Sequence, residues 1–83
     1  MNIKLTGTGK RRFKELQFLI LKSLKNNPLT INEISERSGV NWNSTSHQLI
    51  LLKGHEYVKE IFRHKRLRLF EITDEGERVL KSR

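Results

Sequence analysis

The spacing of apolar residues changes at Gly54, and this change limits the folds that are open to the chain. Before Gly54 the apolar residues recur every three or four positions, as they do on one face of an α-helix. After it, residues 57–63 and 67–73 are rich in β-branched and aromatic residues and alternate imperfectly, as β-strands do. With only 83 residues, both parts belong to one small domain. We therefore predict an α+β fold in which helices precede a hairpin.

The N-terminal part predicts an arm followed by a helix. The first nine residues, MNIKLTGTG, include two glycines and show no helical period, so we predict a flexible arm over residues 1–9 and a folded domain over residues 10–83. A helix is predicted over about 10–26, because the residue before Pro28 avoids helical angles. Its apolar positions are Phe13, Leu16, Ile20 and Leu24.

A short strand and a second, short helix are predicted next. Leu29-Thr30 is the strand. Thr30 and Glu33 have the spacing of a capping box, in which each side chain accepts a hydrogen bond from a free backbone N–H at the start of a helix. The helix covers 31–38 and ends at Gly39, because glycine readily adopts the left-handed conformation that follows a helix.

A third helix follows after a very short break. Asn41 or Asn43 can cap it, and it reaches about Lys53. Two helices joined by a three- to four-residue turn that contains glycine are typical of a helix-turn-helix motif. The residues at core spacing in this third helix are Thr45, Leu49 and Leu52.

The C-terminal third predicts a hairpin and a last helix. His64-Lys65-Arg66 joins the two predicted strands, so the hairpin has a basic tip. Thr73 then caps a helix over 74–81, which has acidic residues in its first turn, as the helix dipole favours.

In this order the segments resemble the winged helix-turn-helix domain of the small prokaryotic transcription regulators of the ArsR and MarR type. LTINEISERSGVNWNSTSHQLILL resembles their strand, second helix, turn and recognition helix, YVKEIFRHKRLRLFEIT resembles their wing, and ITDEGERVL is similar to the entry of their last helix. The resemblance implies a three-helix core, a β-hairpin wing and a short C-terminal helix, and with them DNA binding. The composition, rich in charge, suggests a thermophilic archaeal or archaeal-virus source.

Two positions depart from the pattern of that family. Its members usually have glycine where Glu56 stands, whereas Gly54 comes two residues earlier here. Ile50 occupies a position that is more often polar. We therefore expect a reshaped end of the third helix, and a partner that covers Ile50.

The third helix carries the predicted base-reading residues. No acidic residue occurs between Arg37 and His55, and amide, hydroxyl and imidazole groups form the hydrogen bonds that base edges offer in the major groove. The alternative, an ordinary solvated face, usually mixes Glu and Lys. The predicted base-reading residues are Asn43, Ser44, His47 and Gln48.

Contacts with the DNA backbone are predicted around the same helix. For Trp42 two interpretations stay open, a phosphate contact through the indole N–H and packing against the second helix. The predicted backbone-contacting residues are Asn41, Trp42, Ser46 and Lys53.

The hairpin tip places four permanent positive charges and a histidine in six residues without an acid. Arginine favours the electronegative minor groove, so we predict that the tip contacts the minor groove or the backbone. The alternative is that edge charges prevent strand pairing, for which one lysine would suffice. The predicted wing residues are Arg63, His64, Lys65, Arg66 and Arg68.

Charge and composition limit the functional class. The formal net charge of +8 favours a polyanionic partner, above all nucleic acid. The chain has no cysteine, which removes disulfides, Cys-ligated zinc and thiol catalysis, and its histidines have no ligand at metal-binding spacing. We therefore expect no enzyme activity, cofactor, bound metal or evident small-molecule effector, no membrane segment, and a cytoplasmic location.

The leading hypothesis is a sequence-specific double-stranded-DNA-binding transcription regulator. Residues 41–53 would enter the major groove, and residues 63–68 would hold the backbone or minor groove. A homodimer is expected, with the wide apolar stripe of the first helix, the last helix and Ile50 as candidate contacts. The alternative is an architectural nucleic-acid binder without sequence specificity, or a winged-helix module that binds proteins.

Overall fold

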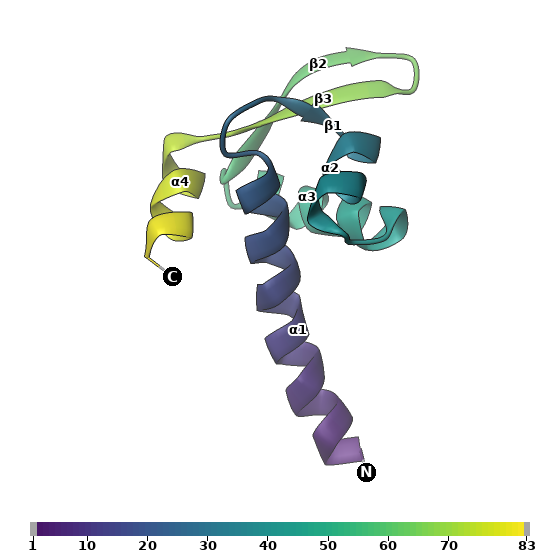
Figure 1. The fold of residues 1–83 in the computed structure, drawn as a ribbon, viewed down its shortest axis with the longest axis vertical. Helices are drawn as coiled ribbons and strands as arrows, with labels where there is room; N and C mark the ends of the chain where they lie inside the picture. The colour runs from purple at the N-terminus through teal and green to yellow at the C-terminus, as the bar shows by residue number, and fades with distance from the viewer. Residues whose placement is uncertain (1, 83) are drawn as a thin grey trace.

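The computed structural model describes the backbone of residues 2–82 and the side chains of residues 12–82. Its helices are α1 (Asn2–Ser23), α2 (Ile31–Ser38), α3 (Trp42–Gly54) and α4 (Asp74–Lys81). Its strands are β1 (Leu29–Thr30), β2 (Val58–His64) and β3 (Leu67–Ile72). The element order and the α+β class therefore agree with the predictions, and Figure 1 shows a helical body with a hairpin along one side of it.

The three strands form one antiparallel sheet in the order β1-β3-β2. Leu29 pairs with Phe70, so the short strand ahead of α2 ties the hairpin to the helical body. We call the β2–β3 hairpin the wing. The register shifts between Glu60 and Phe62, which leaves Ile61 as an extra residue in β2. Such a bulge bends and twists the strand that carries it.

The helix starts and stops follow the local signals read in the sequence. The backbone N–H of Glu33 donates to Thr30 Oγ1 at 3.2 Å and that of Thr30 donates to Glu33 Oε1 at 2.9 Å, which confirms the capping box. Gly39 has a φ of 75° at the end of α2. Asn41 is the residue that caps α3, because its Oδ1 accepts a hydrogen bond from the backbone of Ser44 at 2.8 Å.

The first helix begins earlier than predicted. The structure starts α1 at Asn2 and not near Lys10, so the backbone of residues 2–9 is helical where the sequence predicts a flexible arm. Glycine has a low helix propensity, which argued against a helix here. Extending a helix that is already nucleated costs little per residue, however, and the packed turns of α1 supply the nucleus. Met1 and Arg83, the ends of the predicted arm and domain, lie outside the described residues.

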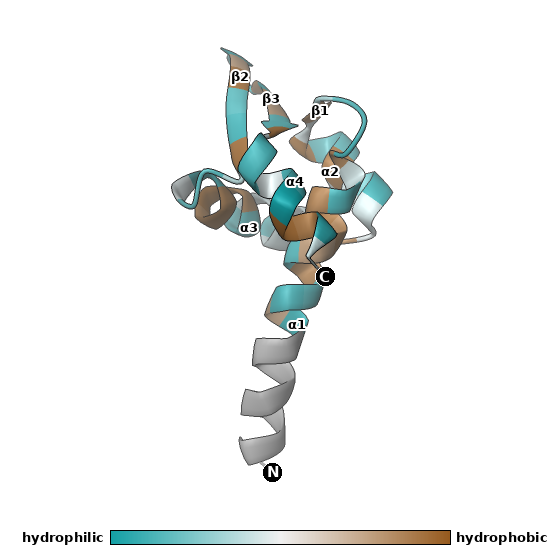
Figure 2. Cartoon of the chain, turned by 90° about the vertical axis from the view of Figure 1, so that its left-hand side faces the viewer, coloured by the Kyte–Doolittle hydropathy of each residue, from teal (hydrophilic) through white to brown (hydrophobic). Residues whose placement is uncertain are grey.

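The hydrophobic core lies where α1, α2 and α3 meet the sheet. Phe70, on the central strand, is 1% exposed and is the largest of the fully buried side chains in the described residues. In Figure 2 hydrophobic segments of the helices gather in the body, whereas the wing has both hydrophobic and hydrophilic segments. The core residues are Ile20, Leu21, Leu24, Leu29, Ile31, Ile34, Val40, Leu49, Leu52, Val58, Phe70 and Ile72.

The C-terminal helix is held against the start of the wing. Thr73 caps α4, because its Oγ1 accepts a hydrogen bond from the backbone of Gly76 at 3.0 Å, and the same hydroxyl donates to the carbonyl of Glu56 at 2.6 Å. Glu56 has a φ of 65°. It therefore adopts the left-handed conformation that favours glycine, and Gly54, two residues earlier, belongs to α3.

Candidate nucleic-acid interface

One face of α3 is turned to solvent and contains no acidic residue. Trp42 is 50% exposed and Ile50 is 64% exposed, and Asn43 and His47 are exposed between them. Ser46, which is half-buried, lies at the edge of this face. We call Trp42, Asn43, Ser46, His47 and Ile50 the α3 outer face. It holds two of the four predicted base-reading residues, Asn43 and His47.

Gln48 was predicted to point outward, and the structure corrects this. It is only 5% exposed, and its Oε1 has no hydrogen-bond partner among the described residues. The reason is the helical period, because position 48 lies three residues after Thr45 and four before Leu52, which are both fully buried. Gln48 therefore belongs to the inward stripe of α3, and its side chain is not available to a base edge.

Ser44 also lies away from the α3 outer face. It is half-buried and lines a hollow between α3 and α1, together with Leu16 and Val40. Its backbone N–H is taken up by the Asn41 cap. Successive residues of a helix point about 100° apart around its axis, so Ser44 and its exposed neighbour Asn43 point in different directions.

The residues predicted to contact the DNA backbone differ in their surroundings. Asn41 and Trp42 are both exposed at the N-terminus of α3, and half of the Trp42 surface is accessible. Ser46 keeps part of its surface accessible. Lys53 is different, because its Nζ lies 3.2 Å from Glu60 Oε1.

Glu60, on β2, is the residue that the sequence analysis missed. Besides Lys53, it accepts hydrogen bonds from Arg63 Nε at 3.1 Å and from Arg68, whose Nε and Nη2 lie 2.8 and 3.1 Å from its two oxygens. Its side chain is 10% exposed. Two of the five wing residues predicted to face DNA are thus paired with a carboxylate. The sequence contains one signal of this pairing, because an acidic residue, Glu60, stands three positions before Arg63.

These contacts explain the electrostatics of the cluster. Hydrogen bonds from Arg68, followed by those from Lys53 and Arg63, outweigh the cost of burial and lower the pKa of Glu60 to about 2. The same pair raises the pKa of Arg68. The guanidinium of Arg68 also lies 5.3 Å from the centroid of the Phe70 ring, so this side chain is held from two sides. We call Glu60 with Lys53, Arg63 and Arg68 the Glu60 cluster.

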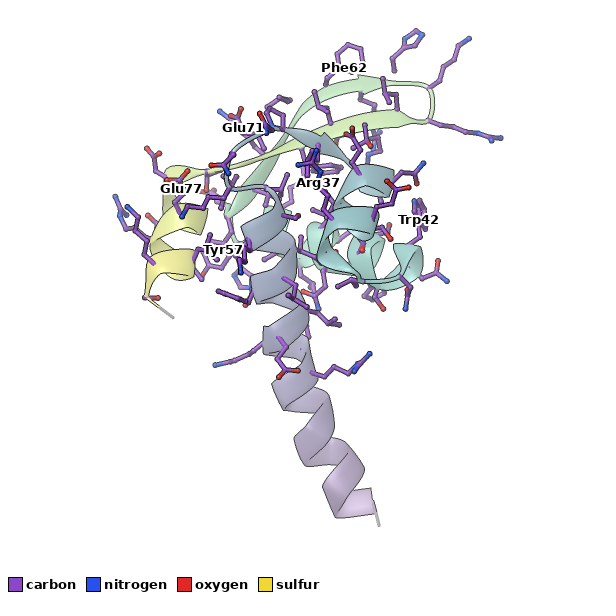
Figure 3. All side chains as sticks on the ribbon, in the orientation of Figure 1. Arg37, Trp42, Tyr57, Phe62, Glu71 and Glu77 are labelled. Carbon is purple, nitrogen blue, oxygen red and sulfur yellow. The ribbon has the colours of Figure 1, made fainter. Side chains whose placement is uncertain are left out.

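The other wing residues are at the tip. His64, Lys65 and Arg66 are exposed, and none of them forms an ion pair with a side chain that the structure describes. Lys65 has a φ of 55° in the turn. The uncompensated charge of the wing is therefore concentrated at the turn. In Figure 3 the tip and Trp42 lie on the same side of the molecule, and α4 with Glu77 lies on the other.

Other kinds of site find less support in the described residues. Within them, no group of three or more His, Asp or Glu side chains is placed to hold a metal ion. No helix in the described part of the chain is long and apolar enough to cross a membrane. The side chains of Lys10 and Arg11, two basic residues in α1, lie outside the described residues.

Comparison with known proteins places the fold. No family model matches the sequence, and no curated protein does. Among solved structures, the transcriptional regulator BldR of Sulfolobus solfataricus superposes with a TM-score of 0.73 at 21% identity, over 98% of this chain and 72% of that one. The adhesin competence repressor AdcR of Streptococcus pyogenes gives a TM-score of 0.75 at 16% identity, over 98% and 62%.

A third structure includes nucleic acid. A mutant MarR of Escherichia coli, complexed with operator DNA, superposes with a TM-score of 0.71 at 20% identity, over 96% of this chain and 66% of that one. The fold is a winged helix-turn-helix. This chain spans 72% of the length of BldR, 66% of that MarR and 62% of AdcR. The winged-helix fold confirms the predicted class, with α2 and α3 as the helix-turn-helix and β2–β3 as the wing.

Proposed function

We propose that this winged-helix chain is a sequence-specific double-stranded-DNA-binding transcription regulator. The observation that carries the proposal is the acid-free α3 outer face, whose Trp42 lies on the same side of the molecule as the uncompensated wing tip. Solved structures that superpose on this chain include a transcriptional regulator and a MarR complexed with operator DNA. In a prokaryotic cell such a regulator acts in the cytoplasm. The archaeal or viral source stays a prediction.

The α3 outer face has the chemistry of a major-groove reader. Asn43 can pair with adenine through two hydrogen bonds, and His47 can donate to the acceptors of guanine. Ile50 adds an apolar surface of the kind that contacts the methyl group of thymine. Its 64% exposure is accounted for if a base edge covers it. In this proposal Asn43, His47 and Ile50 read bases, and Ser46, at the edge of the face, contacts the DNA backbone.

The backbone contacts come from the two ends of this surface. Asn41 and Trp42 lie at the N-terminus of α3, where the helix dipole favours a phosphate. Lys65 and Arg66 extend from the turn of the wing, free of internal carboxylates among the described side chains, and would enter the minor groove or hold its phosphates. His64 lies beside them.

A homodimer is part of this proposal. Phe13 and Leu19 on α1 are 41% and 39% exposed. Phe18 of α1 and Leu80 of α4 line a hollow of about 230 Å³. A two-fold dimer that used α1 and α4 would leave both recognition helices free to occupy the half-sites of a palindrome.

Selection of bound sequences from random duplex DNA, followed by a salt titration, tests the proposal. We expect one recovered motif, with a preference over random duplex of about 10³ or more at physiological salt. The slope of log K against log salt should be close to −0.9 for each phosphate contacted. Equal affinity for the recovered motif and for random duplex would overturn sequence specificity.

Substitutions should separate base reading from backbone contact. His47→Ala or Asn43→Ala should cost about 1–3 kcal/mol on the selected site and relax the preference at one base position. Arg66→Ala should weaken binding to all sequences alike and reduce the salt slope by about one unit. Lys59→Ala is the charge control, because this side chain lies at the start of β2 and is paired with Glu71, and it should leave specific binding nearly unchanged. Equal losses for His47→Ala on both kinds of DNA would contradict the assignment of the reading face.

A second candidate is an architectural DNA binder, and the outer side of the wing favours it. Ile61, Phe62 and Leu67 are between 42% and 51% exposed. Figure 3 shows Phe62 projecting from the wing away from the helices. Architectural proteins insert such side chains between base steps and kink the duplex. Strong bending of random duplex, measured by energy transfer between its labelled ends, would support this candidate over the first.

A further inference from the structure

Glu60 is surrounded by basic side chains from three elements of the winged-helix domain. Lys53 comes from the last turn of α3, Arg63 from the end of β2 and Arg68 from β3. Their nitrogens lie between 2.8 and 3.2 Å from the Glu60 oxygens. One carboxylate therefore connects the recognition helix to both strands of the wing.

The register of the hairpin makes this carboxylate necessary. Arg63 and Arg68 are direct cross-strand partners, and like charges in that position repel each other. Glu60 accepts from the Nε atoms of both arginines through the same oxygen, Oε2. It stands immediately before the bulge at Ile61, where β2 bends. The cluster is therefore placed to hold the angle at which the wing leaves the body.

The cluster also determines which cations are available to a phosphate. Lys53 and Arg63 have side chains that are 51% and 61% exposed, so both could reach DNA if Glu60 released them. The side chain of Arg68 is 28% exposed and rests on the Phe70 ring, so it would stay in place. With Glu60 charged, two exposed cations near the DNA surface are paired internally and contribute little to binding of any sequence.

We propose that Glu60 is a positioning residue that sets DNA specificity, because it fixes the wing relative to α3 and keeps Lys53 and Arg63 from binding phosphates. This inference rests on the proposed function. A fixed spacing between α3 and the wing tip allows both to engage only where the bases match the α3 outer face. Fewer free cations lower the affinity for every other duplex, because counterion release is independent of sequence.

The test compares the full chain with Glu60→Gln, Glu60→Asp and Lys53→Gln, on the selected site and on random duplex, across a range of salt. For Glu60→Gln we expect several-fold tighter binding to random duplex and a salt slope steeper by about one to two units, at about −0.9 per added phosphate. The preference for the selected site should fall about tenfold. Glu60→Asp keeps the charge and should restore part of the preference.

Lys53→Gln removes only the ion pair between α3 and Glu60, and it leaves no cation newly free to bind a phosphate. It should lower the preference without steepening the slope, and because Lys53 is half exposed the variant should fold even if Glu60→Gln does not. Glu71→Gln is the matched control. It removes a carboxylate that lies 3.5 Å from Lys59 in the same sheet, so this ion pair does not join the wing to α3, and it should leave the preference unchanged.

The outcomes distinguish this inference from the proposed function. A preference that survives both Glu60→Gln and Lys53→Gln would overturn the inference and leave the proposed function standing. Equal effects of Glu60→Gln and Glu71→Gln would show that only overall charge matters, and would overturn it too. If Glu60→Gln weakened binding to both the selected site and random duplex, with an unchanged salt slope, Glu60 would have only a structural role. Wild-type protein that prefers no sequence would overturn the proposed function and the inference together.

Discussion

Gly76 marks a close approach between α4 and the start of the wing. A Cβ built on it would lie 2.1 Å from the carbonyl oxygen of Tyr57 and 2.8 Å from Cγ1 of Ile72. Real atoms do not approach so closely, and the first contact is with backbone, which cannot move aside alone. The glycine of the ITDEGERVL motif is therefore required by packing, since its backbone φ is not in the left-handed region.

We expect Gly76→Ala to lower the free energy of unfolding by about 1–3 kcal/mol, because the added methyl group forces α4 away from Tyr57. Gly54→Ala is the control, since nothing lies within 4 Å of a Cβ there and the residue is helical. It should raise the free energy of unfolding by about 0.5–1 kcal/mol. Urea unfolding of both variants checks this. A Gly76→Ala protein as stable as wild type would show that α4 is more loosely held than the structure indicates.

Single residues also show where prediction from the sequence succeeds and fails. Thr30, Glu33 and Gly39 act within one turn of helix, and all three have the predicted roles. Gln48 was predicted to face outward beside an inward row of Thr45, Leu49 and Leu52, but the buried face of α3 is wide enough to include position 48. The period of a helix predicts which residues share a face, whereas the packing around the helix decides how wide its buried face is.

The wing and α3 act as one unit because the Glu60 cluster joins them. The pKa of Glu60 is lowered from 4.5 to about 2 in the folded chain. A carboxyl group whose pKa is depressed by folding stabilises the fold at pH values above its unfolded pKa. This stabilisation is lost as the pH falls through the folded pKa. The Glu60 contribution is thus fully present above about pH 5 and disappears between about pH 4.5 and 2.

We expect wild type to exceed Glu60→Gln in free energy of unfolding by about 1–2 kcal/mol at pH 6, because half-exposed partners and solvent screening reduce the effect of the pKa shift. The difference should shrink towards zero near pH 2. Chemical denaturation of both proteins between pH 6 and 2 measures it, and the other carboxylates cancel in the comparison. A difference that did not change with pH would mean that Glu60 stabilises the wing without its charge.

The helix α1 extends beyond the body and is where association of two chains is expected. Figure 1 shows its N-terminal half projecting away from the sheet and the other helices. Phe13 is 41% exposed and lies outside the core cluster. Burial of such a side chain against a second copy contributes about 1.5–3 kcal/mol, and a domain of this size gains stability when it associates.

Sedimentation should therefore give twice the 9.8 kDa of one chain for wild type. Phe13→Glu should shift the equilibrium to monomer, because an interface would then bury an unpaired charge. Arg12→Gln, at the neighbouring exposed position, is the control for altered charge on this part of α1 and should stay dimeric. Dimeric Phe13→Glu would exclude Phe13 from the interface, and a monomeric wild type would remove the dimer from the proposed function.

The sequence by itself determined the elements and their order, because apolar period, caps and turn residues act within about four positions along the chain. It therefore predicted α2, α3, the wing and α4, with the basic tip at Lys65 and Arg66. Only the tertiary structure decided which face of α3 is free and which wing cations are paired. Glu60 is seven residues from Lys53 and eight from Arg68, and these groups meet only because α3, the bulge and the hairpin register bring them together.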